Sequence, residues 1–164
     1  MSEPPQVSKP DTRIAALTLD ERTVLRRNAD VEHERRVAIF DLLEENFFRP
    51  VSGLSGPYHL HISLAEDRLI FDIQTIERQP LDQIVFSLKG FRSVIKDYFL
   101  ICESYYAAIR RSTPTQIEAI DMGRRGLHDE ASEMLRDRLA EKVEVDSSTA
   151  RRLFTLVCVL HIRS

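Results

Sequence analysis

The apolar positions of the chain change their spacing along its length, and the spacing predicts which elements form. Two runs, Tyr58–Leu64 and Arg68–Ile73, alternate apolar and polar residues on either side of a short polar turn. A period of two is typical of half-buried strands, so these runs predict a β-hairpin. Arg13–Leu19 and Gln83–Leu88 are expected to add strands to the same sheet. Residues 74–82, which include a proline, are expected to form a loop.

Apolar residues three and four positions apart predict helices around these strands. The segment 31–47 has this spacing, and Asp30 is its expected N-cap. The longest such segment is 91–111, where apolar residues occupy so much of the helix surface that we expect burial on several sides. We therefore predict that this helix lies at the centre of the molecule.

The C-terminal third predicts three further helices. Thr113 and Gln116 can form a capping box at the start of the first one. Gly123 and Gly126 interrupt the apolar pattern, which resumes at Leu127. We therefore expect one helix to end before the glycines and another to begin after them.

A last helix, capped by residues 146–148, is apolar on most sides. The order of elements predicts an α+β fold, with a small, mostly antiparallel sheet of about four strands packed against about five helices. We expect residues 13–164 to form a single domain around the long central helix, and residues 1–12 to be a disordered tail.

Arginine dominates the basic residues, although the 164-residue chain has a formal net charge of −3. Of 23 Lys plus Arg, 19 are Arg, and ten of these form five Arg-Arg pairs: 26–27, 35–36, 110–111, 124–125 and 151–152. Guanidinium groups bind carboxylate and phosphate bidentately, so the pairs predict either internal ion pairs or a site for an anion. The net charge and the lack of a basic run argue against nucleic acid as a partner.

The cysteines and the apolar segments indicate a cytoplasmic protein. Cys102 and Cys158 both lie in apolar helical patterns, which suits buried thiols in a reducing compartment. The N-terminus has no apolar core of the signal-peptide type. The apolar run 153–162 is too short to span a bilayer, so we expect no membrane association.

The best candidate for an anion site is the stretch Gly123-Arg124-Arg125-Gly126, followed by His128. Glycines just before a helix N-terminus would expose backbone N–H groups to an anion, and the guanidiniums and the imidazole would add donors. The alternative is a tight helix connection in which the arginines bind nearby acids such as Asp121. Either way, the stretch is neither a Walker loop nor a dinucleotide fingerprint.

Three residues of the helix 91–111 are candidates to support this site. Glu103 has two possible roles, a buried carboxylate with a shifted pKa or a structural ion pair with Arg110 or with a neighbouring helix. Tyr105 is a candidate hydrogen-bond donor. The chain contains no Gly-x-Ser-x-Gly motif, and neither cysteine has an adjacent base, so no nucleophilic centre is predicted.

Two histidine-containing clusters were considered as metal sites. Asp30, His33 and Glu34 lie together at a helix start, where acids usually oppose the helix dipole. His59 and His61 share one face of a strand, which we expect to be the polar face of the hairpin. We therefore expect no metal and no cofactor.

Five long segments resemble the uncharacterised bacterial protein family UPF0262: residues 30–35, 39–46, 96–106, 117–128 and 149–161. The resemblance covers nearly all of the chain past residue 12 and implies a small cytoplasmic bacterial protein. It implies no activity, cofactor or catalytic residue.

Three functions follow as hypotheses. The first is a non-enzymatic binding or regulatory protein, whose arginine-lined site holds an acidic protein or a phosphorylated small molecule. The second is a small enzyme acting on a phosphorylated or carboxylate substrate, with His128 or Glu103 as acid and base. The third is an oligomerisation subunit, in which the apolar last helix completes an interface.

Overall fold

The computed structural model describes residues 11–21 and 29–161. Within them the elements are, in order, β1 (Ile14–Leu19), α1 (Ala29–Glu44), β2 (Phe48–Pro50), β3 (Tyr58–Ala65), β4 (Arg68–Gln74), β5 (Pro80–Ser87), α2 (Arg92–Arg111), α3 (Pro114–Leu139), β6 (Val143–Val145) and α4 (Ser147–His161). The predicted α+β class is confirmed, with four helices in place of about five. The predicted tail up to residue 10 and the arginine pair 26–27 lie outside the described residues.

A four-stranded sheet in the order β1-β3-β4-β5 forms one side of the molecule. The predicted hairpin is present, because β3 and β4 pair antiparallel with Leu60 opposite Ile73 and Ile62 opposite Phe71. β5 continues antiparallel, whereas β1 runs parallel to β3. The predicted loop 74–82 is too long, since β5 already begins at Pro80, at the sheet edge where a proline is tolerated.

A second, two-stranded sheet was not predicted. β2 and β6 pair antiparallel, with Phe48 opposite Val145 and Pro50 opposite Val143. Each strand has three residues, which is too short for alternation to be recognised in a sequence. This sheet joins segments almost a hundred residues apart and places the start of α4 next to the end of α1.

The predicted break at Gly123 and Gly126 is wrong, because both glycines lie inside the continuous 26-residue helix α3. A glycine costs a helix interior only about 0.5–1 kcal/mol relative to alanine, and packing against α2 and α4 outweighs that cost. A Cβ on Gly123 would approach Ile101 Cδ1 of α2 to 3.1 Å, so this glycine allows close helix packing. The predicted capping box of Thr113 and Gln116 is confirmed at the start of α3.

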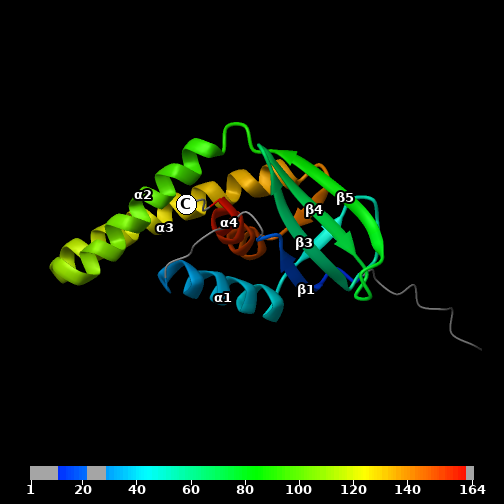
Figure 1. The fold of residues 1–164 in the computed structure, drawn as a ribbon, viewed down its shortest axis with the longest axis horizontal. Coiled ribbons are helices and arrows are strands. Elements are labelled where there is room, and N and C mark those ends of the chain that lie inside the picture. The colour runs from blue at the N-terminus through cyan, green and yellow to red at the C-terminus, as the bar shows by residue number, and fades with distance from the viewer. Residues whose placement is uncertain (1–10, 22–28, 162–164) are drawn as a thin grey trace, which may run out of the picture.

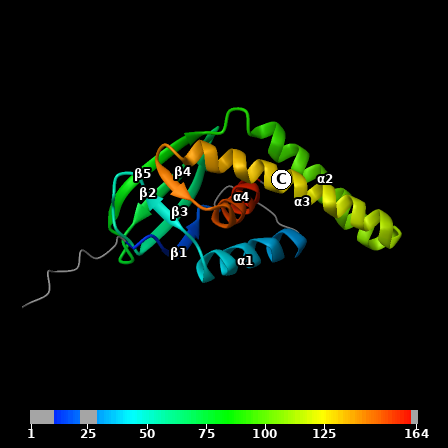
Figure 2. The same cartoon turned by 180° about the vertical axis from the view of Figure 1, so that it is seen from behind.

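The helices differ in burial from the prediction. In Figures 1 and 2, α2 and α3 run side by side away from the sheet. α4 lies in the middle, with α1 on one side, α3 on another and the sheet at its end. α2 therefore buries one face, through residues such as Ile95, Tyr98 and Cys102, and exposes Leu100 and Ile109. The predicted burial of α2 on several sides is wrong, and α4 is the helix that is enclosed.

The helix caps were predicted in part. Asp146 caps α4 as expected, since its Oδ1 accepts a hydrogen bond from the N–H of Thr149 at 2.8 Å. Asp30 is not the N-cap of α1, because the helix already includes Ala29. Asp30 instead lies in the first turn, where its charge favours the dipole and where it pairs with Arg110 at 3.8 Å.

Candidate functional site

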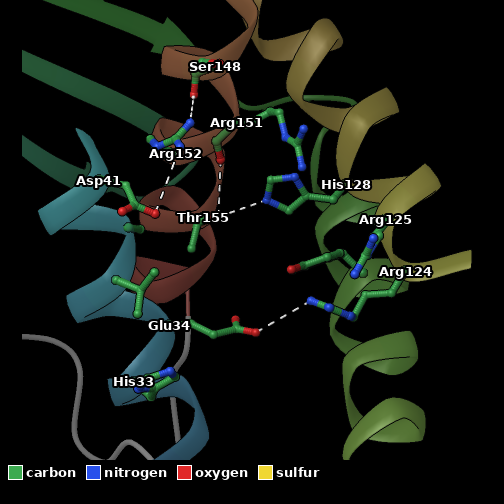
Figure 3. A pocket seen from close by; sticks show the side chains of 13 residues that line it. His33, Glu34, Asp41, Arg124, Arg125, His128, Ser148, Arg151, Arg152 and Thr155 are labelled. Carbon is green, nitrogen blue, oxygen red and sulfur yellow. Dashed lines mark hydrogen bonds and ion pairs between the residues drawn. The ribbon is translucent and has the colours of Figure 1, made fainter. Parts of the chain in front are cut away.

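A pocket of about 570 Å³ opens between α1, α3 and α4, and one side chain of α2 contributes to its wall. The lining residues are His33, Glu34, Val37, Ala38 and Asp41 from α1, Tyr98 from α2, Arg124, Arg125 and His128 from α3, and Ser148, Arg151, Arg152 and Thr155 from α4. In Figure 3, α1 and α3 form opposite walls, with α4 between them. The volume is in the usual range of small-molecule sites.

The lining carries a net positive charge, although the whole chain is negative. Four guanidiniums face two carboxylates, so with neutral histidines the lining has a charge of +2. Two of the arginines come from α3 and two from α4, which places them on different walls (Figure 3). Asp121 and Asp129, which are not among the described lining residues, pair with three of these arginines, so the lining offers an anion guanidinium donors more than an excess of positive charge.

Arg124 is held in place by several contacts at once. Its Nη2 and Nε donate to Asp121 Oδ1 at 2.7 and 3.2 Å, and its guanidinium lies 4.4 Å from the centre of the Tyr105 ring. Its Nη1 also lies 3.8 Å from Glu34 Oε1 on α1. Burial by itself lowers the pKa of Arg124, but the hydrogen bond with Asp121 and the neighbouring acids raise it above the ordinary value. Arg124 therefore joins α1, α2 and α3 as a permanent cation.

Glu34 receives a second contact from α2. The hydroxyl of Tyr106 donates to Glu34 Oε1 at 2.5 Å. Burial and this hydrogen bond to a carboxylate raise the pKa of Tyr106, so the phenol stays protonated and continues to donate. Glu34 is therefore tied to both α2 and α3, and it forms one end of the pocket.

The two arginines of α4 are held less tightly. Arg151 Nε lies 3.3 Å from Asp129 Oδ1, and both side chains are about half exposed. Arg152 lies 4.0 Å from Asp41 and donates through Nη1 to the carbonyl of Ser148 at 3.0 Å. Among the described side chains, the buried Nε of Arg152 has no hydrogen-bond partner. Arg151 and Arg152 therefore keep N–H groups that can donate to a ligand, whereas more of the N–H groups of Arg124 are already engaged.

His128 forms the inner wall, between the aromatic rings of Tyr98 and Phe154, whose centres lie 5.3 and 5.2 Å away. The Thr155 hydroxyl donates to the Arg151 carbonyl at 3.2 Å, so it accepts from His128 Nε2 at 2.8 Å. This assigns the neutral tautomer with its proton on Nε2. Burial, and then the nearby charges of Arg151 and Arg124, lower the pKa of His128 from 6.5 to about 4. The imidazole is therefore neutral at physiological pH.

The structure brings together part of the predicted anion site. Arg124, Arg125 and His128 line the pocket, as their spacing on one helix allows. Gly123 packs toward Ile101, and Gly126 lies on the exposed side of α3. Because α3 is continuous there, its backbone N–H groups are used in the helix, and the predicted helix N-terminus does not exist at this position.

The predicted supporting residues lie mostly elsewhere. Tyr105 supports the site indirectly, through its contact with Arg124. Glu103 is exposed on α2 and is not among the described residues that line the pocket, so of its two possible roles the structure does not show the buried carboxylate. Arg110 pairs with Asp30 away from the pocket lining. His128 lines the pocket and Glu103 does not, so the structure does not bring these two candidate acid and base groups of the enzyme hypothesis into one pocket.

Sequence reasoning missed the contribution of α1 and α4. The sequence shows Arg151 and Arg152 as a pair but does not place them in the site, and it indicates His33 and Glu34 only as metal ligands or as acids at a helix start. The five arginine pairs were a usable signal, since two of the pairs meet here. Which pairs would meet depends on the packing of α3 against α4, and the sequence pattern does not contain that information.

The remaining candidates have structural roles. His59 Nε2 and His61 Nδ1 both hydrogen-bond the Thr18 hydroxyl, at 3.0 and 2.7 Å, and His59 is buried, so the expected polar face is only half exposed. Among residues 11–21 and 29–161, no three His, Cys, Asp or Glu side chains gather closely enough to hold a metal ion. Cys102 and Cys158 are buried as predicted, and burial raises the pKa of Cys102 to about 11.

The fold and the pocket define a small α+β protein with an arginine-lined cavity between helices. In the part of the chain that is described, none of the helices combines the length and the apolar character needed to cross a bilayer. The chain belongs to UPF0262, described as an uncharacterised protein family, whose sequence model matches residues 11–163. This confirms the family resemblance found in the sequence.

Bacterial relatives align with nearly the whole chain. The UPF0262 protein of Paramagnetospirillum magneticum is 60% identical over 151 residues, which cover 92% of this chain and 96% of the relative. That of Rhodospirillum rubrum is 61% identical over 147 residues, covering 90% and 91%. That of Erythrobacter litoralis is 55% identical over 155 residues, covering 92% and 97%. The names of these relatives state no activity, and no solved structure matches the chain.

Proposed function

We propose that this protein is a non-enzymatic binding protein that holds an anionic group in the pocket between α1, α3 and α4. One observation carries the proposal: two arginine pairs from different helices line a single pocket, and the described residues of its lining include only two carboxylates. Guanidiniums that converge from two adjacent helices suit a phosphate or carboxylate, which can accept hydrogen bonds from both.

The contacts within the pocket indicate which arginines are available to a ligand. Arg124 is committed to Asp121 in a half-buried pair, so releasing it would leave a partly buried carboxylate without its partner. Arg125 and Arg151 are both more than half exposed. The pair of Arg151 with Asp129 lies at the surface, where such pairs contribute about 0–1 kcal/mol, so an incoming anion can displace it at little cost. Arg125 shares the mostly buried Asp121 with Arg124, so Asp121 keeps a partner when Arg125 turns to an anion. We therefore assign ligand contact to Arg125 and Arg151, and positioning to Arg124.

The oligomerisation hypothesis loses the feature that motivated it. The apolar residues of α4, among them Leu153 and Leu156, are buried inside the same chain by the sheet and by α1 and α3. They are therefore not exposed for contact with another subunit.

The proposal is tested by replacing the two exposed arginines, Arg125→Ala with Arg151→Ala. Thermal unfolding is followed with inorganic phosphate at constant ionic strength, because salt alone screens surface charge. A ligand that binds only the folded state adds RT ln(1 + [L]/Kd), about 2.7 kcal/mol at a hundred times Kd. We expect phosphate to stabilise the parent protein and not the variant.

The matched control is Arg49→Ala with Arg92→Ala. These two arginines are also more than half exposed and ion-paired, with Glu144 and Asp67, and they lie outside the pocket lining. The control removes the same charge, so it should retain the response of the parent to phosphate. Equal stabilisation of all three proteins, or of none of them, would contradict the assignment.

A further inference from the structure

One rim of the pocket is apolar. Val37 lines the pocket and is 42% exposed, and Phe40, one helical turn further along α1, is 64% exposed. Residues three apart on a helix are neighbours on its surface, so the two side chains form one continuous apolar rim beside the arginines. α1 packs onto the core through Ala38 and Leu42, and the fold therefore does not require Val37 or Phe40.

The apolar surface continues into the pocket. Ala38 and the ring of Tyr98 belong to the lining, and both are buried. On the side of α1, the apolar Val37 and Ala38 lie beside His33, Glu34 and Asp41, while the side of α3 and α4 carries the four guanidiniums. An occupant that binds the guanidiniums and also covers the exposed Val37 needs a charged end and an apolar end.

Building on the proposed function, we infer that the site takes a small amphipathic anion, in which a phosphate or carboxylate group binds Arg125 and Arg151 and an alkyl or aryl group packs on Val37 and Phe40. The cavity of about 570 Å³ suits a molecule of metabolite size better than a protein surface. Each methylene group removed from water strengthens binding about fourfold, so an apolar substituent has a measurable effect.

The experiment compares inorganic phosphate with hexyl phosphate by isothermal titration calorimetry, at concentrations where hexyl phosphate is monomeric. We expect hexyl phosphate to bind the parent protein at least about tenfold more tightly than phosphate. In the variant Val37→Ser with Phe40→Ser, the affinities for the two probes should become about equal. The circular dichroism spectrum of the variant, compared with that of the parent protein, shows whether the variant is folded.

A matched control is Ile76→Ser with Val85→Ser. These two residues are 44% and 46% exposed. Ile76 lies between β4 and β5 and Val85 lies on β5, and neither is among the residues that line the pocket. The control variant should keep the full advantage of hexyl phosphate. A loss of similar size in both variants would overturn the assignment of Val37 and Phe40.

The outcomes separate this inference from the proposed function. If phosphate binds the parent protein and hexyl phosphate binds no more tightly, the inference fails and the anion site remains. If neither probe binds, both fail. A hexaglutamate peptide that binds more tightly than hexyl phosphate would overturn the inference in favour of an acidic protein. Capture by phosphatidylcholine vesicles containing phosphatidic acid, without affinity for monomeric hexyl phosphate, would overturn it in favour of a membrane surface.

Discussion

α2 and α4 have similar apolar patterns in the sequence and very different positions in the molecule. Nine of the fifteen residues of α4 are buried, against four of the twenty residues of α2. α4 is enclosed by the sheet, α1 and α3, whereas α2 forms its main contacts with α3 alone (Figures 1 and 2). An apolar helix surface is therefore necessary for enclosure and does not ensure it, because neighbouring elements must also be available to cover it.

The pocket lies where these two environments meet. Tyr98 from α2 and His128 from α3 form its inner wall and pack against Phe154 of α4, and its charged wall belongs to α3 and α4. The enclosed helix provides a rigid support for Arg151 and Arg152, while α2 holds Arg124 through Tyr105. The site thus depends on both helices, in different ways.

The largest effect should come from truncating equivalent leucines in the two helices. Leu156→Ala in α4 removes a side chain that is fully buried, and we expect it to lower the free energy of unfolding by about 2–5 kcal/mol. Leu100→Ala in α2 removes one that is mostly exposed, with an expected change of about 0.5 kcal/mol or less. Urea unfolding of both variants measures the difference. Similar losses would show that α2 is as enclosed as α4.

An effect of intermediate size is expected from His128, which lies between the two helices and should make the free energy of unfolding depend on pH. The pKa of this histidine is 6.5 in the unfolded chain and about 4 in the folded protein, so between these values the unfolded state binds the additional proton. The free energy of unfolding should therefore be highest above pH 6.5 and fall by up to about 3 kcal/mol as the pH falls to about 4. The variant His128→Gln should lack this part of the pH dependence. Titration of the His128 ring near pH 6.5 in NMR spectra of the folded protein would contradict the prediction.

The smallest effect should separate the two glycines of α3. Gly126→Ala adds a methyl group with no atom within 4 Å, and it should raise the free energy of unfolding by about 0.5–1 kcal/mol through helix propensity. Gly123→Ala should gain less or lose stability, because its Cβ would approach Ile101 of α2 to 3.1 Å. The melting temperatures of the two variants measure this contrast. Destabilisation by Gly126→Ala would indicate that α3 is not continuous there.

Local patterns predicted the parts of the fold that depend on nearby residues. The hairpin of β3 and β4 was predicted from alternation, and the start of α3 from the capping box of Thr113 and Gln116. The break in α3 was predicted wrongly, because the local preference of two glycines is weaker than the packing of the helix around them. Of the anion site, Arg124, Arg125 and His128 could be predicted, since they lie on one helix; Arg151 and Arg152 could not be placed beside them.

The sequence by itself determined the α+β class, most of the strands and helices and the family, because hydrophobic periodicity, capping residues and long matching segments are local properties of the chain. Only the tertiary structure decided which apolar helix is enclosed and which arginine pairs meet. Both depend on contacts between residues far apart in the chain, such as the pairing of β2 with β6 that brings the start of α4 next to the end of α1. Periodicity shows which face of a helix prefers to be buried, and only the complete packing determines what covers it.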